Sequence, residues 1–316
     1  YITSDNYENM NRLLLSSTSG NYQLRYFRNA QVQDEKVATV SAGIYDYDPV
    51  ICCEVIEKAG AKIGYLVLES FDYESHASLA AAVGEFREKN ITDLVLDLRF
   101  NAGGSVAQSR WLTGCIAGAA YKDEIFANLV YNDGQKEEWR FRGGPDNYDG
   151  MGMGPDLGLD RVYVIGSYYT ASASEMVVTS LRGVDFDICL IGGKTEGKNV
   201  GMTVSELTVD GVRYVFSPIT FRIENAKGVS GYDDGLIPDV EISDQDLDFE
   251  DSDIDMMFPY SFGDWLVDGA NTALEIALGY ITGAARTSLA VMPAAARPLA
   301  PCSRSLTPGC YGSYVK

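Results

Sequence analysis

The sequence predicts an α/β fold built around a mostly parallel sheet, and three observations support this prediction. Residues 62–69 and 94–98 are apolar runs of strand length, and a helical pattern separates them. A Gly-Gly loop and a second helical pattern follow the second run. Because strands that alternate with helices pair in parallel, reactive loops are expected at the carboxyl ends of these strands.

The elements of this core are predicted in chain order from their periodicity. The run 94–98 is almost continuously apolar, as expected for a strand covered on both faces. Gly103 and Gly104 follow it and allow close backbone approach. Further elements are predicted as helices at 75–90, 175–181 and 265–281, a helix through Trp111 and Ile116, strands at 125–131, 138–141, 161–165 and 188–191, a Gly-rich surface loop at 143–155, and a hairpin at 203–216 around Asp210-Gly211.

Two segments flank the predicted core, which spans residues 58–285. Residues 1–57 form a front block, with a helix predicted at 4–15 and strands at 22–27 and 37–41. This block is too short to hold a strong core alone. Residues 286–316 are rich in Ala and Pro and show no core pattern, so an irregular tail is expected.

Composition limits the classes of function. The chain has 316 residues and a formal net charge of −20 at pH 7. This charge argues against binding to nucleic acid or to an anionic membrane surface, because both need patches of Lys and Arg. No apolar run of about 18 residues is present to span a membrane. The chain opens at Tyr1 without Met or a visible signal peptide, which suggests a processed or truncated product.

The cysteine pattern does not predict a metal site. The six cysteines include no Cys-x-x-Cys spacing, and the chain has one histidine. Cys302 and Cys310 lie in the Pro-rich tail and could close a small loop in an oxidising compartment. The other four lie in apolar runs and are predicted core residues: Cys52, Cys53, Cys115 and Cys189.

Two short motifs carry the predicted chemistry. Ser172 and Glu175 follow the strand at 161–165, and Lys198 follows the strand at 188–191. A serine and a lysine brought together at the ends of neighbouring strands can serve as nucleophile and base. Taken alone, Ser172-x-x-Glu175 is also the capping box that begins many helices.

Two other interpretations of the polar residues are disfavoured. The segment from Gly192 to Lys198 is a near match to a phosphate-binding loop, but Asn199 follows where that motif needs Ser or Thr. A predicted hairpin also follows where the motif needs a helix. His76 is predicted at the start of a helix, which makes lysine the better candidate for the base of a serine enzyme.

Five blocks of this chain share one order and spacing with a known family. They are Gly64-Tyr65-Leu66 with Ser70-Phe71, Asp97 to Gly104, Thr170 to Glu175, Gly192 to Lys198, and Gly235 to Asp239. Together they resemble the C-terminal processing, or tail-specific, serine peptidases, whose core also occurs in tricorn-type proteases. The resemblance covers roughly residues 60–282.

The resemblance implies a ClpP/crotonase-like α/β core and a Ser/Lys dyad. The family's nucleophile is the first serine of Ser-Ala-Ser-Glu, which is Ser172 here rather than Ser174. Its base is the lysine of Thr-x-Gly-Lys, which is Lys198, and the neighbouring glycines favour this lysine over Lys194. The family's glutamate maps to Glu175.

The resemblance also implies features around the dyad. Oxyanion-hole amides are expected at Ala173 and at Gly103 or Gly104, and no metal or cofactor is required. Residues 1–57 look like the C-terminal half of the PDZ-type domain that members usually carry before the core. Some members have an aspartate eleven residues after the nucleophile, where this chain has Gly183.

A lysine base requires a dry environment. A free lysine has a pKa of about 10.4, so acting near pH 7 takes roughly 4 kcal/mol of differential solvation. Lys198 is therefore expected in an apolar pocket without an ionised carboxylate against it. Glu175 is expected to cap or orient the site, since it lies one helical turn from Ser172.

The function that the resemblance implies is a serine endopeptidase that cleaves unfolded or C-terminal regions of proteins. Its partners would be protein or peptide substrates, bound through their C-termini. An exported, periplasmic or cell-envelope location is the family-level expectation. Two rivals remain open: a catalytically silent peptide-binding homologue on the same fold, and a crotonase-type acyl-CoA enzyme, which would not need Ser172 and Lys198.

Overall fold

The structure is a computed structural model, and it divides the chain into two compact units, Tyr1–Tyr47 and Asp48–Lys316. In the first unit, β1 (Gly20–Phe27) and β2 (Glu35–Ala42) pair antiparallel, which confirms two predicted strands. The structure describes residues 20–27, 35–42, 48–72, 76–141, 154–242, 272–284 and 314–315. The helix predicted at 4–15 lies outside these described residues.

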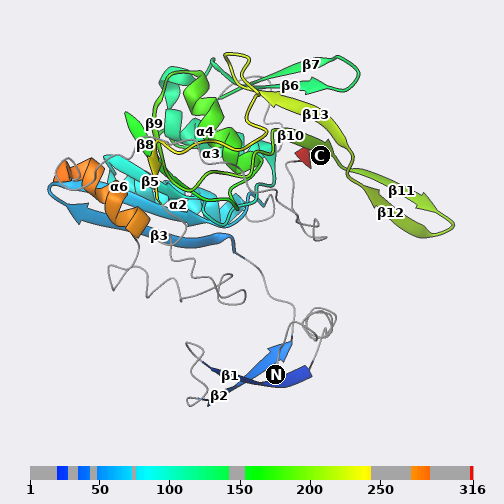
Figure 1. Ribbon diagram of the computed structural model, residues 1–316, viewed down its shortest axis with the longest axis horizontal. Helices are drawn as coiled ribbons and strands as arrows, with labels where there is room; N and C mark the ends of the chain where they lie inside the picture. Colours follow the sequence, from blue (N-terminus) through cyan, green and yellow to red (C-terminus); the bar gives the residue numbers. More distant parts are fainter. Residues whose placement is uncertain are drawn as a thin grey trace. The chain divides into compact units, whose positions relative to one another are not determined.

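Six strands of the second unit form one sheet in the order β14-β9-β8-β5-β4-β3. Figure 1 labels four of them, β9, β8, β5 and β3. Neighbouring strands are parallel, except that β3 and β4 are antiparallel. The predicted α/β fold with a mostly parallel sheet is therefore confirmed. The strands are β3 (Val50–Lys58), β4 (Ala61–Leu68), β5 (Asp93–Asp97), β8 (Arg161–Gly166), β9 (Asp187–Gly192) and β14 (Val240–Glu241).

Strand β3 corrects the predicted end of the front block. The sequence predicts a boundary after residue 57, yet β3 pairs with β4 along its length and the second unit begins at Asp48. The turn between the two strands explains the error. Ala59 and Gly60 both have positive φ, 52° and 87°, as a two-residue hairpin turn of type I′ requires. Alanine is uncommon at the first position of such a turn, so the sequence at Ala59-Gly60 does not predict a hairpin.

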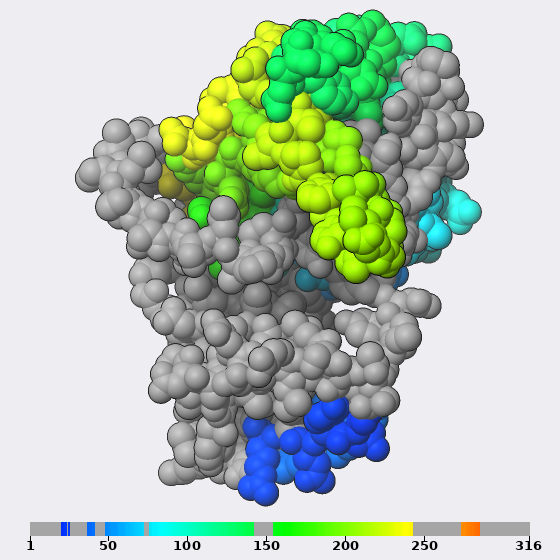
Figure 2. Space-filling model, turned by 90° about the vertical axis from the view of Figure 1, so that its right-hand side faces the viewer, coloured from blue at the N-terminus to red at the C-terminus, as the bar shows by residue number. Residues whose placement is uncertain are grey.

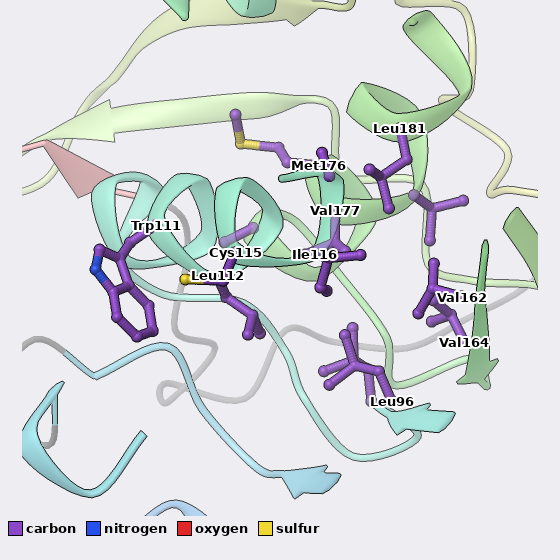
Figure 3. Packing of buried hydrophobic residues seen from close by; sticks show 14 of the residues in the cluster. Leu96, Trp111, Leu112, Cys115, Ile116, Val162, Val164, Met176, Val177 and Leu181 are labelled. Atoms are coloured by element: carbon purple, nitrogen blue, oxygen red, sulfur yellow. The ribbon is translucent and has the colours of Figure 1, made fainter. Parts of the chain in front are cut away.

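Helices cover both faces of the six-stranded sheet. Leu66 and Leu96 pack into one core with α2 (His76–Lys89), α3 (Val106–Ala117) and α4 (Ala173–Gly183). Figure 3 shows apolar side chains of α3 and α4 gathered over the strands in this core. Tyr65 and Val95, one position along each strand, pack on the other face against α6 (Thr272–Thr282). The described part of the helix predicted at 265–281 agrees with α6, and residues 265–271 lie outside the described ranges.

A second sheet has the order β15-β10-β13-β6-β7. Its strands are β6 (Ile125–Tyr131), β7 (Lys136–Arg140), β10 (Val200–Thr203), β13 (Ile219–Glu224) and β15 (Tyr314–Val315). A short 3-10 turn, η2 (Ala119–Tyr121), follows α3. Most of the Gly-rich loop predicted at 143–155 lies outside the described residues.

The predicted hairpin at 203–216 is confirmed as β11 (Ser205–Val209) and β12 (Val212–Phe216), which pair with each other and with no other strand of the described chain. Figure 1 shows this hairpin projecting from the second unit, and Figure 2 shows it from its tip, in yellow-green. It continues the chain from β10 and returns it to β13. The strand that follows Lys198 therefore leads directly into an arm outside the core.

The four cysteines in apolar runs are free thiols. Cys52 and Cys115 are buried, and Cys53 and Cys189 are half-buried, in agreement with the core prediction. Cys302 and Cys310 lie outside the described residues. Among the helices that the structure describes, none has the length and apolarity needed to cross a membrane.

Candidate active site

Ser172 lies at the sharp turn between β8 and α4. It is the N-cap of α4, its backbone torsions are φ 60° and ψ −115°, and it is fully buried. A non-glycine residue at positive φ costs on the order of 1–3 kcal/mol and persists only where the surrounding contacts impose it. Strain of this kind gathers at functional positions, which makes the turn a candidate site.

The side chain of Glu175 binds donors from two separate segments. Its Oε2 accepts the N–H groups of Ser172 and Lys198, both at 2.8 Å. Its Oε1 accepts the N–H of Gly197 at 2.8 Å and the hydroxyl of Thr195 at 2.6 Å. One buried carboxylate thus caps α4, as the capping-box pattern predicts, and also holds the loop that follows β9.

Two opposing effects act on the Glu175 carboxyl. Burial raises its pKa above the ordinary value of 4.5, while the hydrogen bonds from Thr195 and from the three amides lower it. Burial is the larger effect, so the net direction is upward. All four neighbours are donors, and the side chain therefore serves as an acceptor at every one of these contacts.

Lys198 and Lys194 occupy different environments in the loop after β9. Lys198 is half-buried, whereas Lys194 is exposed. The loop turns at Gly197, where φ is 96° and a Cβ would come within 2.5 Å of the Asp233 carbonyl oxygen. Only glycine fits that conformation and that contact. The turn delivers the backbone of Lys198 to Glu175, at the same carboxylate oxygen as the backbone of Ser172.

The Gly loop between β5 and α3 lies directly against the turn that carries Ser172. A Cβ on Gly103 would be 2.8 Å from the Ser172 Cβ and 3.0 Å from the Ala173 nitrogen. A Cβ on Gly104 would be 2.2 Å from the carbonyl oxygen of Phe71, on another side of the loop. Ala173 is the first residue of α4, and first-turn amides have no partner within their helix. The residues expected to form an oxyanion hole are thus brought together.

Five hydrogen bonds fasten this Gly loop to the stretch of chain from Ile165, near the end of β8, to Ser174, in the first turn of α4. The donor of each bond lies on one of the two segments and the acceptor on the other. They run from Leu98 N–H to Ile165 O (2.9 Å), Ser167 Oγ to Arg99 O, Thr170 Oγ1 to Leu98 O (2.7 Å), Ala171 N–H to Asn101 O (3.1 Å), and Ser174 Oγ to Asn101 O (2.9 Å). The two loops therefore form one rigid unit.

A buried ion pair anchors the base of the Gly loop. Arg99 Nη2 lies 2.6 Å from Asp97 Oδ2, and neither side chain is more than 2% exposed. The Tyr65 hydroxyl donates to the same oxygen at 2.9 Å. Removing one partner of such a pair costs about 3–5 kcal/mol, because the other charge is left buried. Within the block Asp97 to Gly104, the first three residues therefore hold the Gly loop in place and have no direct part in the proposed reaction.

Thr195 is a site residue that sequence reasoning missed. Its hydroxyl donates to Glu175 and accepts the N–H of Leu236 at 2.7 Å. The Thr195 N–H in turn donates to the Leu236 carbonyl at 3.1 Å. The Gly235 to Asp239 block therefore closes against the loop that carries Lys198. In the sequence, only the position of Thr195, three residues before Lys198, indicates a role in the site.

Two further predicted positions lie apart from these contacts. His76 begins α2, as predicted, and its ring meets the Trp111 ring edge-on with 4.7 Å between centroids. Gly183 ends α4, at the opposite end from Ser172. A Cβ there would be 3.1 Å from the Asn225 Cβ, so the loop after β13 leaves little room for a larger residue.

No metal centre emerges from the described part of the chain. Among those residues, no group of three or more His, Cys, Asp or Glu side chains is placed to hold an ion.

Comparison with known proteins identifies the family. The model of peptidase family S41 matches residues 62–242. Carboxyl-terminal-processing peptidase 3, chloroplastic, from Arabidopsis thaliana is 27% identical over 191 residues, which cover 57% of this chain and 32% of that protein. Its counterpart peptidase 2 is 29% identical over 148 residues, 46% of this chain and 26% of that protein. The chain thus spans about a third or less of the length of the curated relatives it matches.

Solved structures agree on the fold. A Bacteroides fragilis protein assigned to the S41 proteases has a TM-score of 0.65 at 24% identity, covering 90% of this chain and 70% of that one. The photosystem II D1 C-terminal processing protease has a TM-score of 0.50 at 20% identity, covering 73% of this chain and 57% of that one. Because the family model matches more than half of the residues, this chain belongs to peptidase family S41, a family of serine-type peptidases.

Proposed function

We propose that this chain is a serine endopeptidase that uses Ser172 as nucleophile and Lys198 as base to cleave unfolded or C-terminal regions of proteins. One observation carries the proposal. The Glu175 Oε2 accepts the N–H groups of both residues at 2.8 Å, so one atom ties together two candidate catalytic positions from different elements. The half-buried setting of Lys198, compared with the exposed Lys194, supports the choice of base.

The proposed reaction has two halves. Neutral Lys198 takes the proton from the Ser172 hydroxyl, and the serine oxygen attacks the peptide carbonyl. The negative charge that develops on the carbonyl oxygen is stabilised by the N–H of Ala173 and one N–H of the Gly loop. Protonated Lys198 then gives its proton to the leaving amine. Water attacks the acyl-enzyme in the same way and restores Ser172, so no metal or cofactor is needed.

The substrate class and the wider setting belong to the same proposal. Both Arabidopsis relatives are named carboxyl-terminal-processing peptidases, which supports protein substrates cleaved near a C-terminus. Both are chloroplastic, and an exported compartment is the matching location here. Fractionation of the source cells tests the location.

We also propose a ClpP/crotonase-like core and a PDZ-like origin for the front unit. The β1–β2 hairpin supports the proposal for the front unit.

The test is digestion of an unfolded protein, read by mass spectrometry, together with labelling by a fluorophosphonate. Wild type is expected to cleave and to be labelled at Ser172, whereas Ser172→Ala and Lys198→Ala lose cleavage by at least about 10⁴-fold. Matched controls are Ser180→Ala, a buried serine of the same helix, and Lys194→Ala. Because Ser172 is fully buried, attack requires part of the surrounding chain to open, and labelling measures that access.

The outcomes separate the enzyme from its catalytically silent rival. Full activity in Ser172→Ala would end the proposal. A folded wild-type protein that binds peptides but shows neither cleavage nor labelling would be the catalytically silent homologue.

A further inference from the structure

Asn101 is a fully buried residue that connects three segments around the Gly loop. Its Nδ2 donates to the carbonyl of Leu68, at the end of β4, at 3.0 Å, and its Oδ1 accepts the N–H of Gly103 at 2.9 Å. Its own carbonyl accepts the Ala171 N–H at 3.1 Å and the Ser174 hydroxyl at 2.9 Å. One side chain and one carbonyl therefore fix the Gly loop both to the sheet and to the turn of Ser172.

The N–H groups of Gly103 and Gly104 differ in what they can bind, because the contacts of the two glycines differ. The Gly103 N–H is committed to Asn101. The Gly103 carbonyl accepts the N–H of Phe71 at 3.0 Å, and the peptide that follows it is trans. In a trans peptide the N–H points opposite to the carbonyl, so the Gly104 N–H points away from Phe71. The α-carbon of Gly103, at the start of that peptide, lies beside Ser172 and the Ala173 nitrogen.

We infer that Asn101 is a positioning residue for the oxyanion hole of the proposed peptidase. It occupies the Gly103 N–H and so leaves the Gly104 N–H, together with that of Ala173, to receive the negative charge. The inference rests on the proposed function and adds to it which glycine donates and what orients it. An oxyanion hole works by preorganisation, because donors that need no reorganisation stabilise charge as it forms. The two hydrogen bonds of the Asn101 side chain supply that rigidity.

A matched control exists in the same chain. Asn225 is also buried, its Nδ2 donates to the carbonyl of Thr179 at 3.1 Å, and its Oδ1 accepts the amides of Lys227 and Val229 at 3.0 Å each. It therefore makes the same kind of backbone clamp at the far end of α4. Asn101→Ala removes two side-chain hydrogen bonds to the backbone and Asn225→Ala removes three, but only the first variant affects the Gly loop.

The experiment measures kcat and KM for an unfolded peptide substrate and the inhibition constant of a peptide aldehyde, which forms an oxyanion on the serine. Asn101→Ala is expected to lower kcat about 100- to 1,000-fold, the loss typical of one oxyanion donor, with KM within about threefold of wild type. Affinity for the aldehyde falls in parallel. Asn225→Ala keeps kcat within about threefold of the wild-type value. Equal kcat values in the two alanine variants would overturn the inference.

A second measurement needs no variant. In a crystal structure of the wild-type protein with the aldehyde bound, the oxyanion is expected within about 3 Å of the Gly104 and Ala173 nitrogens, with Gly103 still bonded to Asn101. An oxyanion on the Gly103 nitrogen instead would refute the role of Asn101 and leave the peptidase intact. A wild-type protein that neither cleaves peptides nor forms the adduct would refute the proposed function itself.

Discussion

Glu175 combines two roles that compete when only the sequence is considered. Ser172-x-x-Glu175 is either a helix cap or part of a catalytic motif, and the structure shows that the cap does not exclude the second role. The carboxylate accepts the Ser172 N–H in the manner of a capping box. It also accepts hydrogen bonds from Thr195, Gly197 and Lys198. The same carboxylate therefore both caps the helix and positions the loop that carries Lys198.

Glu175→Gln is expected to lower the free energy of unfolding by about 2–4 kcal/mol and to reduce kcat/KM by at least about 100-fold. Glutamine has one acceptor oxygen, and its NH₂ group would face two of the four donors. Urea unfolding at pH 7 and peptide cleavage measure the two effects. Glu196→Gln is the control, because Glu196 is an exposed neighbour of Thr195 and its loss should cost less than about 0.5 kcal/mol. Equal stability of the two variants would contradict the role of Glu175.

The core cysteines should be chemically inert in the folded protein. Burial raises the pKa of Cys52 and Cys189 to about 12 and that of Cys53 to about 11. At pH 8 a thiol of pKa 12 is only about 0.01% thiolate, and the thiolate is the reactive form. Iodoacetamide is therefore expected to leave these residues unmodified in native protein and to modify them in urea, as read by peptide mass spectrometry. Fast labelling of native Cys189, relative to free N-acetylcysteine, would show that the pKa is not raised.

At the scale of elements, the sequence predicts those whose pattern is local. Strand β5 has an apolar centre from Leu94 to Leu96, α2 repeats Leu79, Val83 and Phe86 at helical spacing, and the hairpin surrounds Asp210-Gly211. Strand β3 is assigned to the wrong unit because its turn uses Ala59 rather than a typical turn residue. The roles of Asn101 and Thr195 could not be predicted, since each depends on backbone groups from distant segments that meet only in the folded chain.

The β11–β12 hairpin should contribute little to the stability of the core. Leu207 and Tyr214 are paired across it on one face, and they are 54% and 47% exposed. Leu207→Ser combined with Tyr214→Ser is therefore expected to change the free energy of unfolding by less than about 1 kcal/mol. Leu112→Ala, in the core between α3 and the sheet, should cost about 2–5 kcal/mol. Urea unfolding compares the two, and a loss from the hairpin variant as large as that of Leu112→Ala would show that the arm packs on the core.

At the scale of the whole molecule, the site is assembled from three loops that the parallel sheet places side by side. Strands β5 and β8 are neighbours, and the Gly loop and the Ser172 turn leave their carboxyl ends. Strand β9 is the next neighbour and delivers the lysine loop to the same edge. Residues far apart in sequence thus meet because parallel strands end together. The family match at 62–242 begins within β4, so β3 is a part of this sheet that the match leaves out.

Truncation at two points tests whether β3 belongs to the catalytic unit. A chain that starts at Asp48 keeps all six strands and is expected to unfold in one cooperative transition, with nearly the stability that the second unit has in the full-length chain. A chain that starts at Ala61 loses the ladder along β4 and exposes an apolar strand edge that includes Ile63 and Tyr65. It should lose at least about 3 kcal/mol or aggregate, because both sheet hydrogen bonds and burial are removed. Tryptophan fluorescence in urea and light scattering measure the two outcomes. Equal stability of both chains would return the boundary to the end of β3, and an unfolded Asp48 chain would show that residues 1–47 are needed for the core to fold.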